Sequence, residues 1–111
     1  MSTDDLAAGF EYPDDGEGIP DEPQRLRCED IPGGLRAALE AVLMVVEEPI
    51  AEIALASALE QPLASVQHAL IQLAQEYERD QRGFALRRLA GGWRFYSRAD
   101  LAPHVESYLI D

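Results

Sequence analysis

The sequence has no lysine, a single cysteine and no long apolar run. Cys28 alone cannot form an internal disulfide, and no CxxC pair or Cys/His cluster indicates a metal site. We therefore expect a reducing compartment such as the cytoplasm, with no metal or other cofactor. The longest uninterrupted apolar stretch, residues 41–46, is far shorter than the roughly 20 residues that span a bilayer, so no membrane span is expected.

Positive charge is scarce, because 21 carboxylates face nine cations, all of them arginine, and the formal net charge is −12. Residues 1–32 hold ten of the carboxylates and two of the arginines, whereas residues 33–111 hold 11 and seven. Phosphate repels such a protein unless a local basic patch compensates. Bulk charge therefore disfavours nucleic-acid binding.

The sequence also lacks a catalytic constellation. Its two histidines, His68 and His104, lie on different predicted elements, and neither is near a plausible serine or cysteine nucleophile. The glycine pairs at residues 33–34 and 91–92 are isolated turn signals and form neither a P-loop nor a dinucleotide-binding pattern. We predict a binding module and not an enzyme.

The chain divides near residue 33. Residues 1–33 combine acidic side chains with four prolines and show no helical or strand periodicity, so we expect a disordered acidic tail. From Gly34 the apolar residues recur at helical spacing. Residues 34–111 are therefore predicted to form the folded domain.

Within that domain the pattern predicts three helices, a β-hairpin and a terminal helix. The first two helices cover about residues 34–47 and 52–59, and a third, capped by Ser65, runs to about Asp80. Two strand-like runs, 84–90 and 93–97, are joined by a predicted Gly91-Gly92 turn. This order predicts a mainly α fold with a small β-hairpin, the winged helix-turn-helix.

The first helix is apolar on two sides. One side is the expected core face, and the opposite side carries a second set of small or apolar residues: Ala37, Ala41, Met44 and Val45. So small a domain has little with which to bury both sides, so we predict that the second side contacts another polypeptide chain. The alternative is that alanine is simply a frequent helix former here.

The third helix is the one that enters the DNA major groove in DNA-binding winged helices. Its outward stripe is neutral to basic: His68, Gln72, Gln75 and Arg79. These are the DNA-reading candidates under an alternative function as a transcription regulator. Carboxylates at residues 76, 78 and 80 flank the stripe, so a solvated or protein-facing helix is favoured.

The predicted hairpin concentrates the positive charge. Residues 82–98 contain five arginines and no carboxylate. We expect Trp93 and Phe95 to cover the core. The partner-contact candidates on this wing are Arg87, Arg94, Tyr96 and Arg98, which could meet a phosphate backbone or an acidic protein segment, including the chain's own acidic tail.

From Leu35 onward the chain resembles the N-terminal winged-helix domain of bacterial segregation and condensation protein B. The most specific string is Ala-Gly-Gly-aromatic-Arg, followed by an arginine, an acidic residue and Ala-Pro. Four stretches carry the likeness: LRAALEAVLMVVEEPI (35–50), ALASAL (54–59), LIQLAQEYERDQRGFAL (70–86) and AGGWRFYSRADLAPHV (90–105).

The resemblance implies a non-enzymatic accessory subunit of the bacterial SMC condensin complex. Such subunits form homodimers and bind the kleisin, segregation and condensation protein A, which bridges the SMC heads. Direct DNA binding is not expected of them, and a nucleoid-associated cytoplasmic location is. Family members also carry a second winged helix, so we expect residues 34–111 to be the first of two, and the chain to be cut before the second. The acidic tail is not part of the family pattern.

Overall fold

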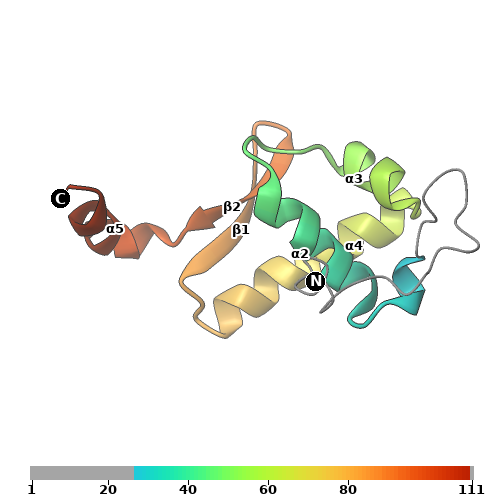
Figure 1. The fold of residues 1–111 in the computed structure, drawn as a ribbon, viewed down its shortest axis with the longest axis horizontal. Helices are drawn as coiled ribbons and strands as arrows, with labels where there is room; N and C mark the ends of the chain where they lie inside the picture. Colours follow the sequence, from blue (N-terminus) through green and yellow to red (C-terminus); the bar gives the residue numbers. More distant parts are fainter. Residues whose placement is uncertain (1–26, 111) are drawn as a thin grey trace, which may run out of the picture.

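The computed structural model describes residues 27–110, in which three helices precede a two-stranded hairpin (Figure 1). Two short 3-10 turns and a terminal helix complete the order. The elements are η2 (Cys28–Asp30), α2 (Gly34–Val45), α3 (Glu52–Leu59), α4 (Leu63–Arg79), β1 (Phe84–Leu89), β2 (Gly92–Ser97), η3 (Ala99–Leu101) and α5 (Ala102–Leu109). The predicted mainly α winged helix is confirmed.

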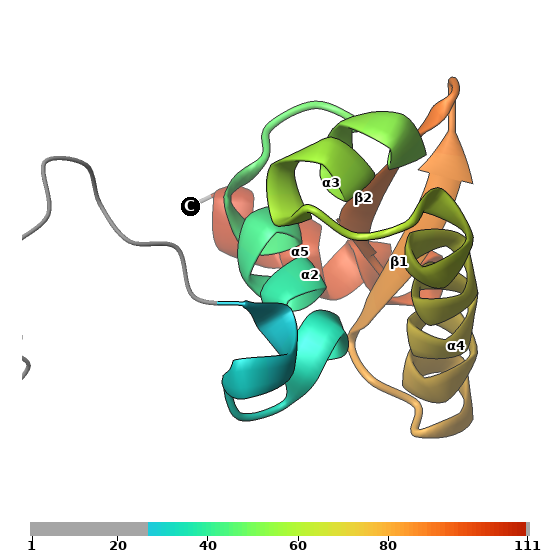
Figure 2. The ribbon, with the colours of Figure 1, turned by 90° about the vertical axis from the view of Figure 1, so that its right-hand side faces the viewer.

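The core lies between the three helices and the inner face of the hairpin (Figure 2). Helical spacing in the sequence, at i, i+4, i+7 and i+11, predicts four inward residues of α4, and all four are buried: Val66, Leu70, Leu73 and Tyr77. The helix starts at Leu63, not after Ser65, and Pro62 occupies the N-cap position. Trp93 is only 6 % exposed and Phe95 packs against the same cluster, as expected.

The hairpin turn consists of Ala90 and Gly91, and not of the predicted Gly91-Gly92 pair. Both turn residues have positive φ, 55° and 80°, and the register pairs Leu89 with Gly92. Two consecutive positive φ values match the right-handed twist of the flanking strands. Gly92 instead belongs to β2.

Gly92 allows the loop between α2 and α3 to lie against β2. A Cβ at this position would come 2.7 Å from the Pro49 carbonyl carbon and 2.8 Å from the Ile50 nitrogen. Beside it, Ile50 and Trp93 exchange two backbone hydrogen bonds of 3.0 and 2.8 Å. The Ile50 link thus extends the hairpin at the β2 edge.

The prediction of a disordered tail is wrong for its last residues, 27–33. Cys28 to Asp30 form the turn η2, and Cys28 is only 5 % exposed. Its Sγ donates to the Leu59 carbonyl at 3.9 Å. Burial of Cys28 against the helices stabilises a segment whose own composition gives no helical pattern. The rest of the predicted tail, residues 1–26, lies outside the described residues.

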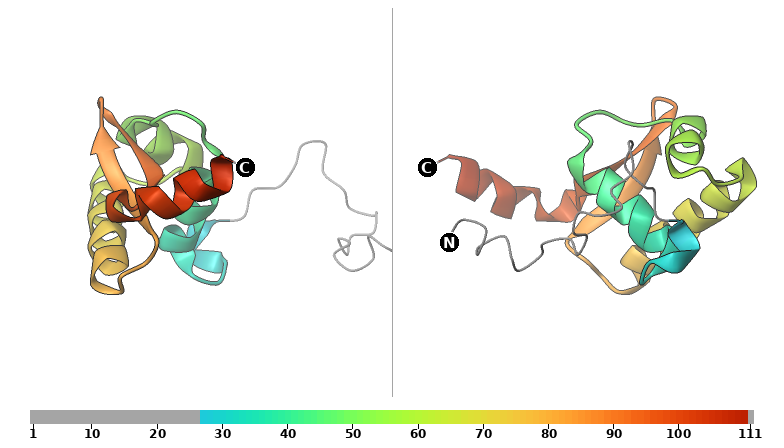
Figure 3. Two further views of the ribbon diagram at one scale, coloured as in Figure 1. Left: turned by 90° about the vertical axis from the view of Figure 1, so that its left-hand side faces the viewer. Right: turned by 45° about the vertical axis from the view of Figure 1, so that its right-hand side comes forward.

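Helix α5 extends away from the helical core beyond the hairpin (Figure 3). None of its residues is buried, and Tyr108, Leu109 and Ile110 at its end are strongly exposed. No helix in residues 27–110 is long and apolar enough to cross a lipid bilayer.

Candidate protein-binding surfaces

The second apolar side of α2 is open toward its C-terminal end. Met44 and Val45 are 71 % and 73 % exposed, and Ala41 is exposed beside them. Ala37 is half-buried, because the turn at Gly33 passes over it. We call Ala41, Met44 and Val45 the α2 apolar patch. Residues 27–110 therefore leave most of this side uncovered.

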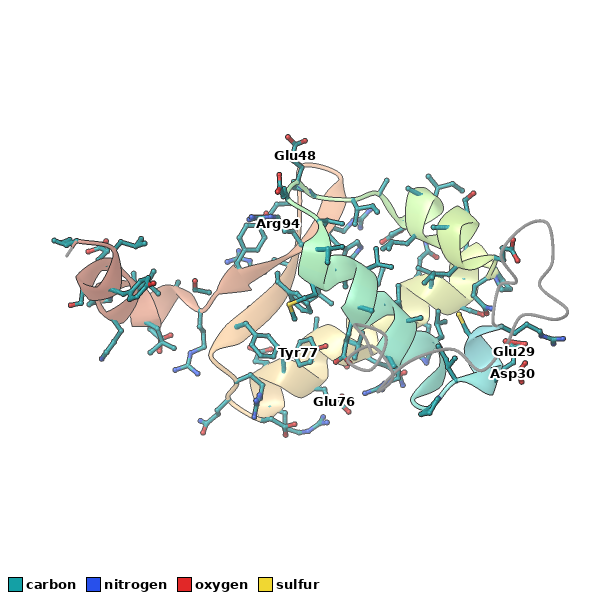
Figure 4. The ribbon with its side chains drawn as sticks, viewed as in Figure 1. Glu29, Asp30, Glu48, Glu76, Tyr77 and Arg94 are labelled. Atoms are coloured by element: carbon teal, nitrogen blue, oxygen red, sulfur yellow. The ribbon has the colours of Figure 1, made fainter. Side chains whose placement is uncertain are left out.

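The charged stripe of α2, formed by Arg36 and Glu40, is in contrast bound to α4. Arg36 pairs with Glu76, and the Tyr77 hydroxyl donates to Glu40. Burial raises the pKa of Tyr77, and the hydrogen bond to the Glu40 carboxylate raises it further. Figure 4 shows Glu76 and Tyr77 on α4, at some distance from the labelled hairpin residue Arg94. These contacts fix the orientation of α2 and so the direction in which its apolar patch faces.

The outer face of the hairpin brings together three of the four predicted wing residues. The register places Arg87 directly opposite Arg94 and Ala85 opposite Tyr96. The Arg94 guanidinium lies over the Tyr96 ring, 5.1 Å from its centroid, and the Arg94 Nε is buried without a hydrogen-bond partner among the described residues. We call Arg87, Arg94 and Tyr96 the arginine face. Like charges directly opposite each other destabilise a strand pair, so an anionic partner would reduce the repulsion between Arg87 and Arg94.

Arg98, the fourth predicted wing residue, lies at the base of the hairpin and is fully engaged there. Its guanidinium binds the Asp100 carboxylate at 2.7 and 3.2 Å and the carbonyls of Gln81 and Arg82 at 3.2 and 3.0 Å. The hydrogen bond from Arg98 lowers the pKa of Asp100. Arg98 therefore joins the end of α4 to the end of β2 and is not part of the arginine face.

The four DNA-reading candidates are exposed along α4: His68, Gln72, Gln75 and Arg79. The structure also places carboxylates beside them. The Arg79 guanidinium lies 3.8 Å from the Glu76 carboxylate, and Glu78, the residue before Arg79, is exposed. Ile71 is exposed as well, which suits a solvated or protein-facing helix better than a phosphate-facing one.

Glu52 was not recognised from the sequence, yet it connects three elements. Its carboxylate accepts hydrogen bonds from Trp93 Nε1 at 2.8 Å and Gln67 Nε2 at 2.9 Å, and it lies 3.7 Å from Arg88. The Trp93 and Gln67 hydrogen bonds lower the pKa of Glu52. No local pattern points to this role, because all three partners are distant in sequence.

A groove of about 560 Å³ between α4 and β1 was also not predicted. It is lined by residues 84–87 of β1, by the C-terminal part of α4 and by Arg82. No cluster of three or more His, Cys, Asp or Glu side chains suited to a metal ion occurs in the part of the chain that the structure describes.

A family model for the segregation and condensation complex subunit ScpB matches residues 37–111. The chain belongs to this family. Two curated proteins named segregation and condensation protein B are similar to it. The protein from Desulforamulus reducens is 34 % identical over 71 residues, 64 % of this chain and 39 % of the relative. That from Moorella thermoacetica is 35 % identical over 75 residues, 68 % of this chain and 38 % of the relative. The chain thus spans under two fifths of the length of these relatives.

Solved structures agree with this family assignment. ScpB from Mycobacterium tuberculosis is 39 % identical, with a TM-score of 0.70 over 79 % of this chain and 52 % of that one. A dimer of an ScpB N-terminal domain complexed with an ScpA peptide shares the fold, with 24 % identity and a TM-score of 0.63 over 67 % of this chain and 89 % of that one.

Proposed function

We propose that this chain is a non-enzymatic adaptor of the bacterial SMC condensin complex, acting in chromosome condensation and segregation. It homodimerises, binds the kleisin segregation and condensation protein A, and works in the cytoplasm at the nucleoid. The family match over residues 37–111 carries the proposal. The solved relative, a dimer of the N-terminal domain with an ScpA peptide, supports it. Residues 34–111 would then be the first of two winged helices in the full-length protein.

The α2 apolar patch supports the dimer. Met44 and Val45 are large apolar side chains, more than two thirds exposed, at one end of a helix whose charged stripe is already paired with α4. Association through this patch would remove apolar surface from water, which favours the dimer by about 25 cal/mol for each Å² buried. The proposed dimer contact is therefore made by Ala41, Met44 and Val45, with Ala37 at its edge.

The arginine face supports the kleisin contact. Arg87 and Arg94 have no carboxylate partner among residues 27–110, and Tyr96 gives an aromatic surface beside them. Guanidinium groups pair well with carboxylates, and arginine and tyrosine are enriched in protein interfaces. An acidic protein segment would pair with both arginines. Nucleic acid is a less suitable partner, because its phosphates repel a protein with a net charge of −12.

Binding of the kleisin central region to the full chain tests the proposed function directly. Isothermal titration should give a measurable dissociation constant for the wild type, and Arg94→Glu should weaken it about tenfold, because a charge-assisted contact is replaced by repulsion. Arg79→Glu is the matched control, since it makes the same charge change on α4 and should leave binding unchanged. No binding by the wild type would contradict the proposed function. Equal weakening by both variants would remove the arginine face from the contact.

A further inference from the structure

Strand β1 forms one edge of the two-stranded sheet. In an antiparallel pair, residues that exchange backbone hydrogen bonds alternate with residues whose N–H and C=O groups point away from the partner strand. The 2.9 Å bond from the Arg98 N–H to the Gly83 carbonyl fixes this alternation at the base of the hairpin. With the observed register, the groups that point away from β2 belong to Phe84, Leu86 and Arg88.

The two edges of the hairpin differ in whether their outward backbone groups are hydrogen-bonded. At the β2 edge, Ile50 binds both outward backbone groups of Trp93. At the β1 edge, the structure of residues 27–110 shows no hydrogen bond to the backbone of Phe84, Leu86 or Arg88. An unpaired row of N–H and C=O groups is a template onto which an extended segment can add as a further strand.

The groove between α4 and β1 exposes this edge. Residues 84–87 are four consecutive residues of one strand, and all four line it. Because successive side chains of a strand point to opposite faces, a groove lined by consecutive residues contains the edge of the strand and not one face. The opposite wall is the C-terminal part of α4, which lies beside β1 in Figure 2.

The charge of the groove selects the kind of segment that would fit. Arg82 and Arg87 line it, and neither has a carboxylate partner among the described residues, whereas Arg98 is neutralised by Asp100. With Glu78, the lining holds three arginines against two carboxylates, so the groove keeps a net positive charge. Two copies pairing through β1 would bring arginines against arginines, which disfavours a second copy. An acidic segment, in contrast, gains charge-assisted contacts.

We propose that β1 accepts a third strand from the partner polypeptide, an extended segment in which acidic side chains alternate with apolar ones. The acidic side chains lie beside Arg87 on the outer face of the sheet, and the apolar ones lie beside Phe84 on the inner face. The segment hydrogen-bonds to the backbone of residues 84, 86 and 88. The inference rests on the proposed function in taking the kleisin as the source of this segment.

Amide hydrogen exchange, resolved by NMR on the full chain, tests the strand addition. In the free protein the amides of Phe84, Leu86 and Arg88 should exchange fast. Saturation with the kleisin central region should slow them by more than about tenfold. Ala85 and Arg87 are the internal controls, because their amides already face β2 and should change little. A ten-residue peptide of alternating glutamate and valine is a second probe.

Each outcome of this experiment decides the inference. Slowed exchange at residues 84, 86 and 88 with either probe supports the added strand, and slowing by the synthetic peptide alone would support it while contradicting the kleisin function. Kleisin binding without slowing at these amides would overturn the added strand and leave the proposed function intact. Failure of both probes to slow these amides would also overturn the added strand. Protection already present in the free chain would also overturn it. If that protection is lost on dilution, a second copy of the chain covers the edge of β1. If the protection does not depend on protein concentration, residues 1–26 of the same chain cover this edge.

Discussion

Glu52 joins α3 to both α4 and the hairpin through one carboxylate. Only 15 % of its side chain is exposed, and the Trp93 and Gln67 hydrogen bonds hold its pKa below the ordinary value of 4.5. A carboxyl whose pKa is lower in the folded state than in the unfolded state stabilises the fold above the unfolded pKa. That contribution is lost as the pH falls through the folded pKa.

We expect Glu52→Gln to lower the free energy of unfolding by about 1–2 kcal/mol at pH 7, because an ionised acceptor is lost. The variant should also lose less stability than the wild type when the pH is lowered from about 6 to about 3. Urea unfolding at a series of pH values measures both effects. Glu47→Gln is the control, since it removes an exposed carboxylate with no described hydrogen bond. A parallel pH dependence in wild type and Glu52→Gln would show that Glu52 does not contribute as described.

At the scale of elements, the hairpin is held to the helices by its close approach to the loop before α3. We expect Gly92→Ala to destabilise the protein by about 1–3 kcal/mol, because the added Cβ would meet the backbone of Pro49 and Ile50. The matched control is Gly83→Ala, where the nearest atom is a leucine methyl at 3.7 Å and φ is not positive. Thermal unfolding of the two variants compares them. A melting temperature for Gly92→Ala equal to that of Gly83→Ala would contradict the close approach.

Some features of the helices and strands could be predicted from the sequence, and others could not. Helical periodicity predicted four of the five buried residues of α4 and missed Ala69, and period-two alternation separated Trp93 and Phe95 from Arg94 and Tyr96. These patterns are local, since each is set by the geometry of a single helix or strand. The burial of Cys28 was the less favoured alternative to a place in the tail, and the roles of Glu52 and of the free edge of β1 were not predicted. Each depends on a partner far along the chain, or on which of two strand edges another segment covers.

At the scale of the whole molecule, residues 27–110 leave the α2 apolar patch and the end of α5 uncovered. Helix α5 buries none of its residues against the domain that precedes it. The family resemblance is confirmed by the match over residues 37–111, and the binding of other polypeptides is a proposal that these surfaces support. The individual contact residues stay predictions, because a surface is defined by its partner as much as by its own side chains.

Sedimentation velocity of the full chain at high micromolar concentration tests the central claim, that the open side of α2 is an interface. We predict a dimer for the wild type and a folded monomer for Met44→Glu, because a buried unpaired carboxylate opposes association. His68→Glu, on the exposed face of α4, is the control and should remain a dimer. A wild type that sediments only as a monomer would contradict the account.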